Sequence, residues 1–127
     1  SDKGFTKNQL EQIKFGLKAG VDVSKYADSK FTWQQMSEIF DGLDEGYDVS
    51  IYAKPEFNNW QMHEILEGLI EEVDVSIYAD PKFTSKQMEI IREGLSQGLD
   101  ARKYANPQFS AAKMEQIAKE LAMETYK

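Results

Sequence analysis

Hydrophobic residues recur along this chain at a fixed interval of 26 positions. The three series share one register and run through the whole sequence: Phe5, Phe31, Phe57, Phe83 and Phe109; Ile13, Ile39, Ile65, Ile91 and Ile117; Leu17, Leu43, Leu69, Leu95 and Leu121. Coincident series of this kind are typical of a repeat architecture. The pattern predicts a single array over residues 1–127, with units 5–30, 31–56, 57–82 and 83–108 and a terminal half-unit 109–127.

Each unit opens with the signals that start a helix. In the first unit Thr6 is a good N-cap, and Gln9 three residues later completes a capping box. Leu10, Ile13 and Leu17 then fall on one face of a helix of about 14 residues. The equivalent capping pairs are Thr32 with Gln35, Asn58 with Gln61 and Thr84 with Gln87, whereas Ser110 is followed by Lys113 and keeps half of the box.

Glycine occupies two more repeated positions. Gly20, Gly46 and Gly98 stand where a left-handed residue ends a helix, and Glu72 in the third unit predicts a helix that ends differently or runs on. A glycine inside a helix costs about 1 kcal/mol relative to alanine, so a glycine repeated there needs a packing reason. We expect another backbone, that of the short second helix or of the next unit, to approach Gly16, Gly42, Gly68 and Gly94.

The second half of each unit predicts a short helix of one to two turns. Asp22, Asp48, Asp74 and Asp100 are natural N-caps for it. A tyrosine recurs on its inner face, at Tyr26, Tyr52, Tyr78 and Tyr104, and we expect the hydroxyls to bind backbone groups. The predicted fold is therefore all-α: an α-solenoid of long-helix/short-helix repeats with a terminal single helix.

The repeat has a specific consensus, F-T-x-x-Q-M-x-x-I-x-x-G-L-x-x-G-x-D-V-S-x-Y-A-D-P. It resembles a family of 26-residue helical repeats found in many uncharacterised bacterial proteins, some of them linked to mobile elements. The resemblance covers essentially the whole chain. It implies a helical array and carries no defined activity or catalytic residue.

Acidic residues are concentrated in the middle of the chain, whose net charge is −7. Residues 31–56 and residues 57–82 each hold six acidic and one basic residue, whereas residues 1–30 hold four acidic and six basic ones. This balance argues against direct binding of nucleic acid.

The chain contains no cysteine, and no apolar run approaches the ~20 residues of a membrane span. We expect a cytoplasmic protein without a cofactor.

Candidate chemistry is sparse. His63 is the only histidine, and no nucleophile forms a recognisable constellation with it. The acidic run that begins at Asp41 fails the calcium-loop pattern, because Leu43 and Tyr52 stand where oxygen ligands are needed. We therefore expect a protein that is not an enzyme and that holds no metal.

One helical row changes character along the array and predicts a partner-binding face. The row holds Lys7, Lys14 and Lys18 in the first unit and small or charged residues in the last two. In the middle units it becomes apolar, and Trp60 lies further outward on the helical wheel. An apolar patch with an acidic rim is typical of a protein interface. The predicted partner-binding residues are Trp33, Phe40, Trp60, Leu66, Ile70, Asp44, Glu45, Glu67 and Glu71.

The expected function is a non-enzymatic module for protein–protein interaction, whose partner carries a basic surface. The row could equally form a homodimer interface, or its apolar side chains could pack against neighbouring helices. Two alternative functions are a structural spacer within a longer repeat protein and an acidic decoy for a nucleic-acid-binding protein.

Overall fold

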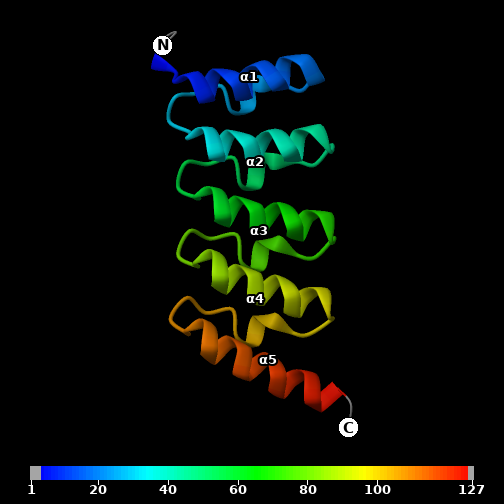
Figure 1. The fold of residues 1–127 in the computed structure, drawn as a ribbon. Helices are drawn as coiled ribbons and strands as arrows, with labels where there is room; N and C mark the ends of the chain where they lie inside the picture. The colour runs from blue at the N-terminus through cyan, green and yellow to red at the C-terminus, as the bar shows by residue number, and fades with distance from the viewer. Residues whose placement is uncertain (1–3, 126–127) are drawn as a thin grey trace. The chain divides into compact units, whose positions relative to one another are not determined.

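The computed structural model describes residues 4–125, and within them every regular element is helical. Long α-helices alternate with single 3₁₀ turns, as Figure 1 shows. The elements are α1 (Lys7–Ala19), η2 (Val23–Lys25), α2 (Trp33–Asp44), η3 (Val49–Ile51), α3 (Asn59–Ile70), η4 (Val75–Ile77), α4 (Ser85–Ser96), η5 (Ala101–Lys103) and α5 (Ala111–Thr125). The predicted all-α repeat fold is confirmed, and the short second helix is a three-residue 3₁₀ turn.

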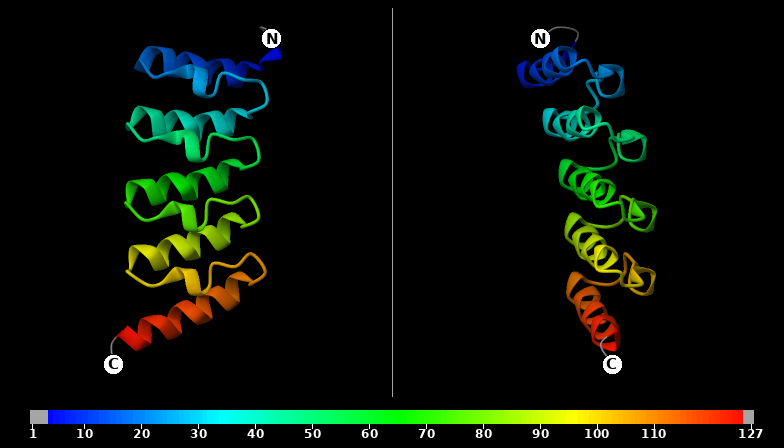
Figure 2. Two further views of the ribbon diagram at one scale, coloured as in Figure 1. Left: turned by 180° about the vertical axis from the view of Figure 1, so that it is seen from behind. Right: turned by 90° about the vertical axis from the view of Figure 1, so that its right-hand side faces the viewer.

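The chain divides into two units, Ser1–Leu66 and Glu67–Lys127. In the first unit α1 packs against α2, and in the second α4 packs against α5. Within each unit the 3₁₀ turns lie on one side of the long helices (Figure 2). The core lies between these two layers, because the residues that face it are fully buried: Tyr26, Met36, Ile39 and Tyr52 in the first unit, and Tyr78, Met88, Ile91 and Tyr104 in the second.

The capping boxes form as predicted, and they also join successive repeats. Gln35 accepts a hydrogen bond from the Thr32 amide at 2.8 Å, and the Gln35 amide lies 3.1 Å from the Thr32 hydroxyl. The side-chain nitrogen of Gln35 then donates to the carbonyl of Phe57, in the next repeat, at 2.6 Å. Gln9 and Gln87 make the same bond to Phe31 and Phe109. Sequence reasoning identified the cap but missed this second bond.

The last long helix keeps only half of the box, as predicted. The Ser110 hydroxyl accepts from the Lys113 amide at 3.1 Å. A lysine side chain has no oxygen to return a bond to the Ser110 amide. Asp100 departs from prediction in a similar way: unlike Asp22, Asp48 and Asp74 it makes no capping bond. The serine whose amide those aspartates bind is replaced by Arg102 in the fourth repeat.

The helical glycines are required by side chains, and the expected approach of another backbone is wrong. A Cβ atom on Gly42 would collide with the hydroxyl of Tyr52 and lie 2.6 Å from Cγ1 of Val49. Both residues belong to the same repeat as the glycine, so the contact joins the long helix to its own 3₁₀ turn. The Tyr52 hydroxyl crosses this gap and donates to the Glu38 carbonyl at 2.8 Å.

The tyrosine hydroxyls differ in how they are satisfied. Tyr26 donates to the carbonyl of Gln12 at 2.6 Å, as the sequence predicted. The Tyr104 hydroxyl is buried, yet it has no hydrogen-bond partner among residues 4–125. Burial raises the pKa of Tyr104, and the nearby Glu93 carboxylate raises it further. Burial also raises the pKa of Tyr52, reinforced by Glu38. These side chains therefore stay neutral.

The third repeat corrects another prediction. Its helix ends at Ile70, at the same place in the repeat as α2 and α4, and does not run on. Glu72 adopts the left-handed conformation, with φ 61°, where Gly46 and Gly98 have φ 86° and 82°. The backbone bond from the Val73 amide to the Gly68 carbonyl fixes this turn as its counterparts do elsewhere. The repeat geometry therefore overrides the side chain's preference.

Replacing Glu72 with glycine is expected to raise the free energy of unfolding by about 1 kcal/mol. Left-handed backbone costs a residue with a Cβ about 1–2 kcal/mol, and the greater freedom of glycine in the unfolded chain offsets part of the gain. Urea unfolding measures the change. Glu45→Gly is the matched control, because Glu45 has φ −87° and no such strain to relieve. A Glu72→Gly protein that loses as much stability as the control contradicts the explanation.

Candidate interaction surface

The predicted apolar row is only partly exposed. In the first unit, Trp33 begins α2 and is 39% exposed, and Phe40 lies two turns further along the same helix, half-buried. Trp60 is 65% exposed in the first turn of α3, which agrees with its outward place on the helical wheel. Leu66 is only 3% exposed, so its assignment to a partner-binding surface is wrong. Its aliphatic side chain packs into the core instead.

The other predicted site residues divide between the two units. Ile70 is 38% exposed at the end of α3 and belongs to the second unit, with Glu67 and Glu71. Glu71 is already paired, because Arg92 of α4 donates to it at 2.8 Å. Glu67 is half-buried. The surface that the first unit offers by itself is therefore built from Trp33, Phe40, Trp60, Asp44 and Glu45.

The end of α2 concentrates negative charge. Asp44 and Glu45 are exposed there, beside Asp41, and the last turn of this helix contains no basic residue. The C-terminal end of a helix already carries a partial negative charge, which disfavours carboxylates. Partial burial, then Glu45 and Asp44, raise the pKa of Asp41, whereas His63 lowers it. Asp41 was missed as a site residue, although the acidic run in the sequence contains it.

This charge arrangement is costly to the fold and accessible to a ligand. Among residues 4–125 the structure records no ion pair for Asp41, Asp44 or Glu45. A cation brought by a partner would relieve the repulsion among these carboxylates. We call Trp33, Phe40, Trp60 and these three acids the α2–α3 surface, all of it within the first unit.

Other chemistry is limited among residues 4–125. Nδ1 of His63 lies 3.4 Å from Oε2 of Glu38, an exposed contact that joins two repeats. No group of three or more acidic, histidine or cysteine side chains there is arranged to hold a metal ion. The helices described in this range include none with the length and apolarity to cross a bilayer.

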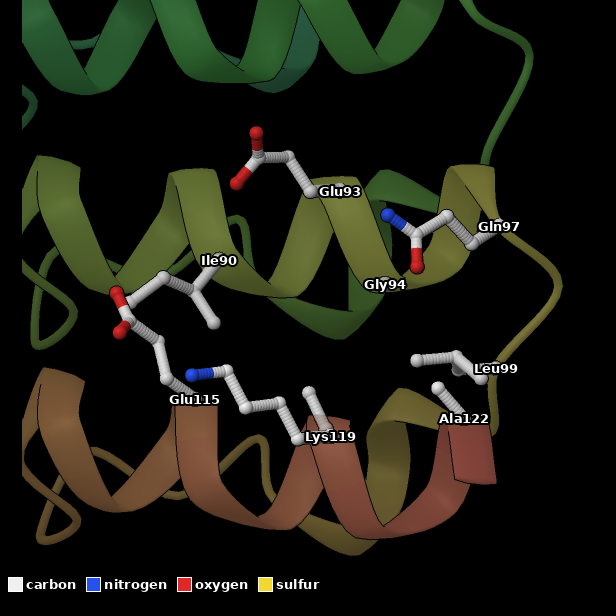
Figure 3. Close-up of a pocket in the computed structure, with 9 residues that line it drawn as sticks. Ile90, Glu93, Gly94, Gln97, Leu99, Glu115, Lys119 and Ala122 are labelled. Atoms are coloured by element: carbon white, nitrogen blue, oxygen red, sulfur yellow. The ribbon is translucent and has the colours of Figure 1, made fainter. Parts of the chain in front are cut away.

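A groove of about 260 Å³ lies in the second unit, between α4 and α5. Figure 3 shows Ile90 reaching down from α4 toward α5, and Leu99 close to Ala122 at the opposite end. Glu115 and Lys119 rise from α5, whereas the Glu93 carboxylate is directed away from that helix. The sequence pattern does not indicate this groove, because small residues on one helix do not show whether a neighbouring helix fills the space beside them.

Comparison of the chain with models of protein families, with curated proteins and with solved structures found no match. Any assignment of function therefore depends on the side chains of the chain itself.

Proposed function

We propose that this chain is a non-enzymatic helical repeat module that binds another protein through the α2–α3 surface. The observation that carries the proposal is the exposure of Trp60, 65% of whose surface faces solvent in the first turn of α3. Tryptophan dominates binding energy at many protein interfaces, and it is seldom left exposed without a role.

The chemistry of this surface favours a basic partner with an apolar anchor. Asp41, Asp44 and Glu45 attract lysine and arginine side chains, which can also lie over the face of an indole ring. Phe40 offers apolar area next to Asp41, and Trp33 offers more at the start of the same helix. A partner segment that alternates basic and apolar residues would satisfy both halves of the surface.

Trp60→Ala is expected to weaken partner binding at least tenfold, because it removes the largest exposed apolar side chain of the first unit. Phe15→Ala is the matched control: Phe15 is also an exposed aromatic residue of this unit, 48% exposed, but it lies outside the α2–α3 surface. Affinity capture, with quantitative mass spectrometry, should show proteins retained by the wild type and by Phe15→Ala and lost by Trp60→Ala.

The intrinsic fluorescence of the protein gives a direct second measurement. The chain has two tryptophans, and both belong to the α2–α3 surface. A captured partner should shift their emission to shorter wavelength as it removes them from water. Equal capture by Trp60→Ala and wild type, or binding without any change in emission, would contradict the proposal. Circular dichroism must first show that the variants keep wild-type helicity.

A second candidate function is a structural spacer between other repeats, and one observation favours it. Leu17 of α1 is 64% exposed, whereas its counterparts Leu43, Leu69 and Leu95 are half-buried. A further helix of the same type would cover Leu17. This alternative requires no partner at the α2–α3 surface, so the fluorescence measurement separates the two functions.

A further inference from the structure

The groove between α4 and α5 exists because the last helix carries alanine where other repeats carry larger side chains. Ala118 lies along the groove, and so does Ala122, one turn further on. The residues equivalent to Ala118, at 26-residue steps, are Lys14, Phe40, Leu66 and Arg92. In the rest of the array this position therefore supplies a long or bulky side chain, and in α5 the space is left open.

Arg92 shows how such a side chain fits in the same unit. Its side chain is only 14% exposed, and its guanidinium reaches Glu71, the first residue after α3, at 2.8 Å. The residue equivalent to Glu71 in the next repeat is Gln97, which follows α4 directly and lines the groove. In the groove, Gln97 therefore stands where Glu71 accepts the bond from Arg92. The arginine itself is replaced by Ala118.

The lining suits an arginine side chain. Ile90, Leu99 and the two alanines provide apolar contact for the aliphatic part. Gln97 offers a side-chain amide oxygen at one end, and Glu115 offers a carboxylate on the opposite wall. Glu93 and Glu115 are the acidic residues of the lining and Lys119 is its basic one, so the lining carries one net negative charge. The Glu93 carboxylate is directed away from α5, but Glu93 stands one turn before Gln97 on α4, where it can turn toward a cationic guest.

We propose that this groove receives an arginine side chain from a partner protein, in the manner in which the preceding repeat holds Arg92. The guest's methylene groups lie over Ala118 and Leu99, and its guanidinium bonds to Gln97 and to the carboxylate of Glu93, one turn earlier on α4. Arginine fits better than lysine because its planar fork can bond to two acceptors at once. The groove lies in the second unit and is a site separate from the α2–α3 surface.

The test fills the groove from within the chain. Ala118→Arg introduces the residue that the fourth repeat has at this position, and it should be tolerated because Arg92 is. Ala112→Arg is the matched control: it adds the same charge to the same helix at an exposed position outside the groove lining. The probes are octa-arginine and octa-lysine, titrated in 0.15 M salt. Binding is followed by the methyl resonances of Leu99 and Ala122 and, separately, by tryptophan fluorescence.

The expected result is that octa-arginine shifts the Leu99 and Ala122 resonances of the wild type and of Ala112→Arg. The dissociation constant should rise at least tenfold in Ala118→Arg, and octa-lysine should bind at least fivefold more weakly than octa-arginine. Equal weakening by the two arginine substitutions would overturn the proposal, since charge alone would then explain it. Equal affinities for the two peptides, or no shift at either residue, would overturn it as well.

A replacement variant and the tryptophan emission keep the result decisive. If Ala118→Arg fails to fold, Ala118→Leu takes its place, because Leu66 holds the equivalent position in the third repeat. A change in tryptophan emission without a shift at Leu99 would place the peptide on the α2–α3 surface and overturn the groove proposal alone. Failure of the groove therefore leaves the proposed function standing, and loss of the Trp60 effect leaves the groove proposal standing.

Discussion

Gly94→Ala is expected to lower the free energy of unfolding by about 2–3 kcal/mol. On helix propensity alone the same change should raise it by about 1 kcal/mol, so the sign of the effect is diagnostic. A Cβ atom at this position would collide with the hydroxyl of Tyr104 and lie 3.1 Å from its Cζ atom. The tyrosine is fully buried and cannot move aside without disturbing the core.

The double variant Gly94→Ala/Tyr104→Phe should recover most of this loss. The substitution removes the oxygen with which the Cβ atom collides, and it sacrifices no hydrogen bond, because the Tyr104 hydroxyl has none among the described residues. Urea unfolding of the wild type, both single variants and the double variant gives the coupling energy. Additive effects would show that the hydroxyl is not what excludes a side chain from position 94.

The second repeat provides the comparison in which rescue should fail. A Cβ atom on Gly42 would meet Val49 as well as Tyr52, whereas the fourth repeat has Ala101 at the position of that valine. Tyr52→Phe also breaks the hydrogen bond to the Glu38 carbonyl. Gly42→Ala/Tyr52→Phe should therefore remain about 2 kcal/mol or more less stable than the wild type.

Gln35→Glu is expected to lower the free energy of unfolding by about 3 kcal/mol at neutral pH. The introduced carboxylate can still accept from the Thr32 amide, so the capping box survives. It has no hydrogen to donate to the Phe57 carbonyl, which lies 2.6 Å from the glutamine nitrogen. The result would be a nearly buried negative charge facing a carbonyl oxygen, since Gln35 is 6% exposed.

The pH dependence of this variant identifies the cause. The folded environment should raise the pKa of the introduced carboxyl group above its unfolded value. The penalty should therefore be full at high pH and shrink as the pH falls through the raised value, where a protonated carboxyl group can donate the missing bond. A series of urea transitions between pH 7 and pH 4.5, compared with the wild type, measures this.

Lys113→Glu serves as the control for the cap itself. Lys113 occupies the position of the glutamines in the last repeat, is exposed, and makes no described bond to a following repeat. Glutamate there can complete the box with Ser110, so stability should be unchanged or slightly raised. An equal loss in Gln35→Glu and Lys113→Glu would mean that the bond between repeats contributes nothing.

Most of the fold was predictable because its signals are local. Thr32 and Gln35 lie three residues apart, and their capping box follows from spacing alone. The turn after α3 was mispredicted because the left-handed conformation of Glu72 is imposed by the surrounding repeat, which outweighs the preference of one side chain. The repeat period thus carried more information about this turn than the residue that occupies it.

The candidate sites were harder to predict because exposure depends on neighbouring helices. Phe40 and Leu66 hold equivalent positions in successive repeats, yet one is half-buried and the other is 3% exposed. A helical wheel gives them the same direction and cannot separate them. The groove beside Ala118 has the same origin, since a short side chain makes a cavity only where a neighbour fails to fill the space.

The bonds from each glutamine to the next repeat imply an order in which the repeats fold as well as an order along the chain. Gln9 and Gln35 each bind a carbonyl 22 residues further along the chain. A ribosome builds the chain from the N-terminus, so each glutamine amide emerges before its acceptor exists. In the growing protein, the glutamine side chain of the newest complete helix would lack its acceptor. It would form its bond when the phenylalanine of the next repeat is added. Folding during translation would then proceed one repeat at a time, as each glutamine side chain bonds to the repeat that has just been added.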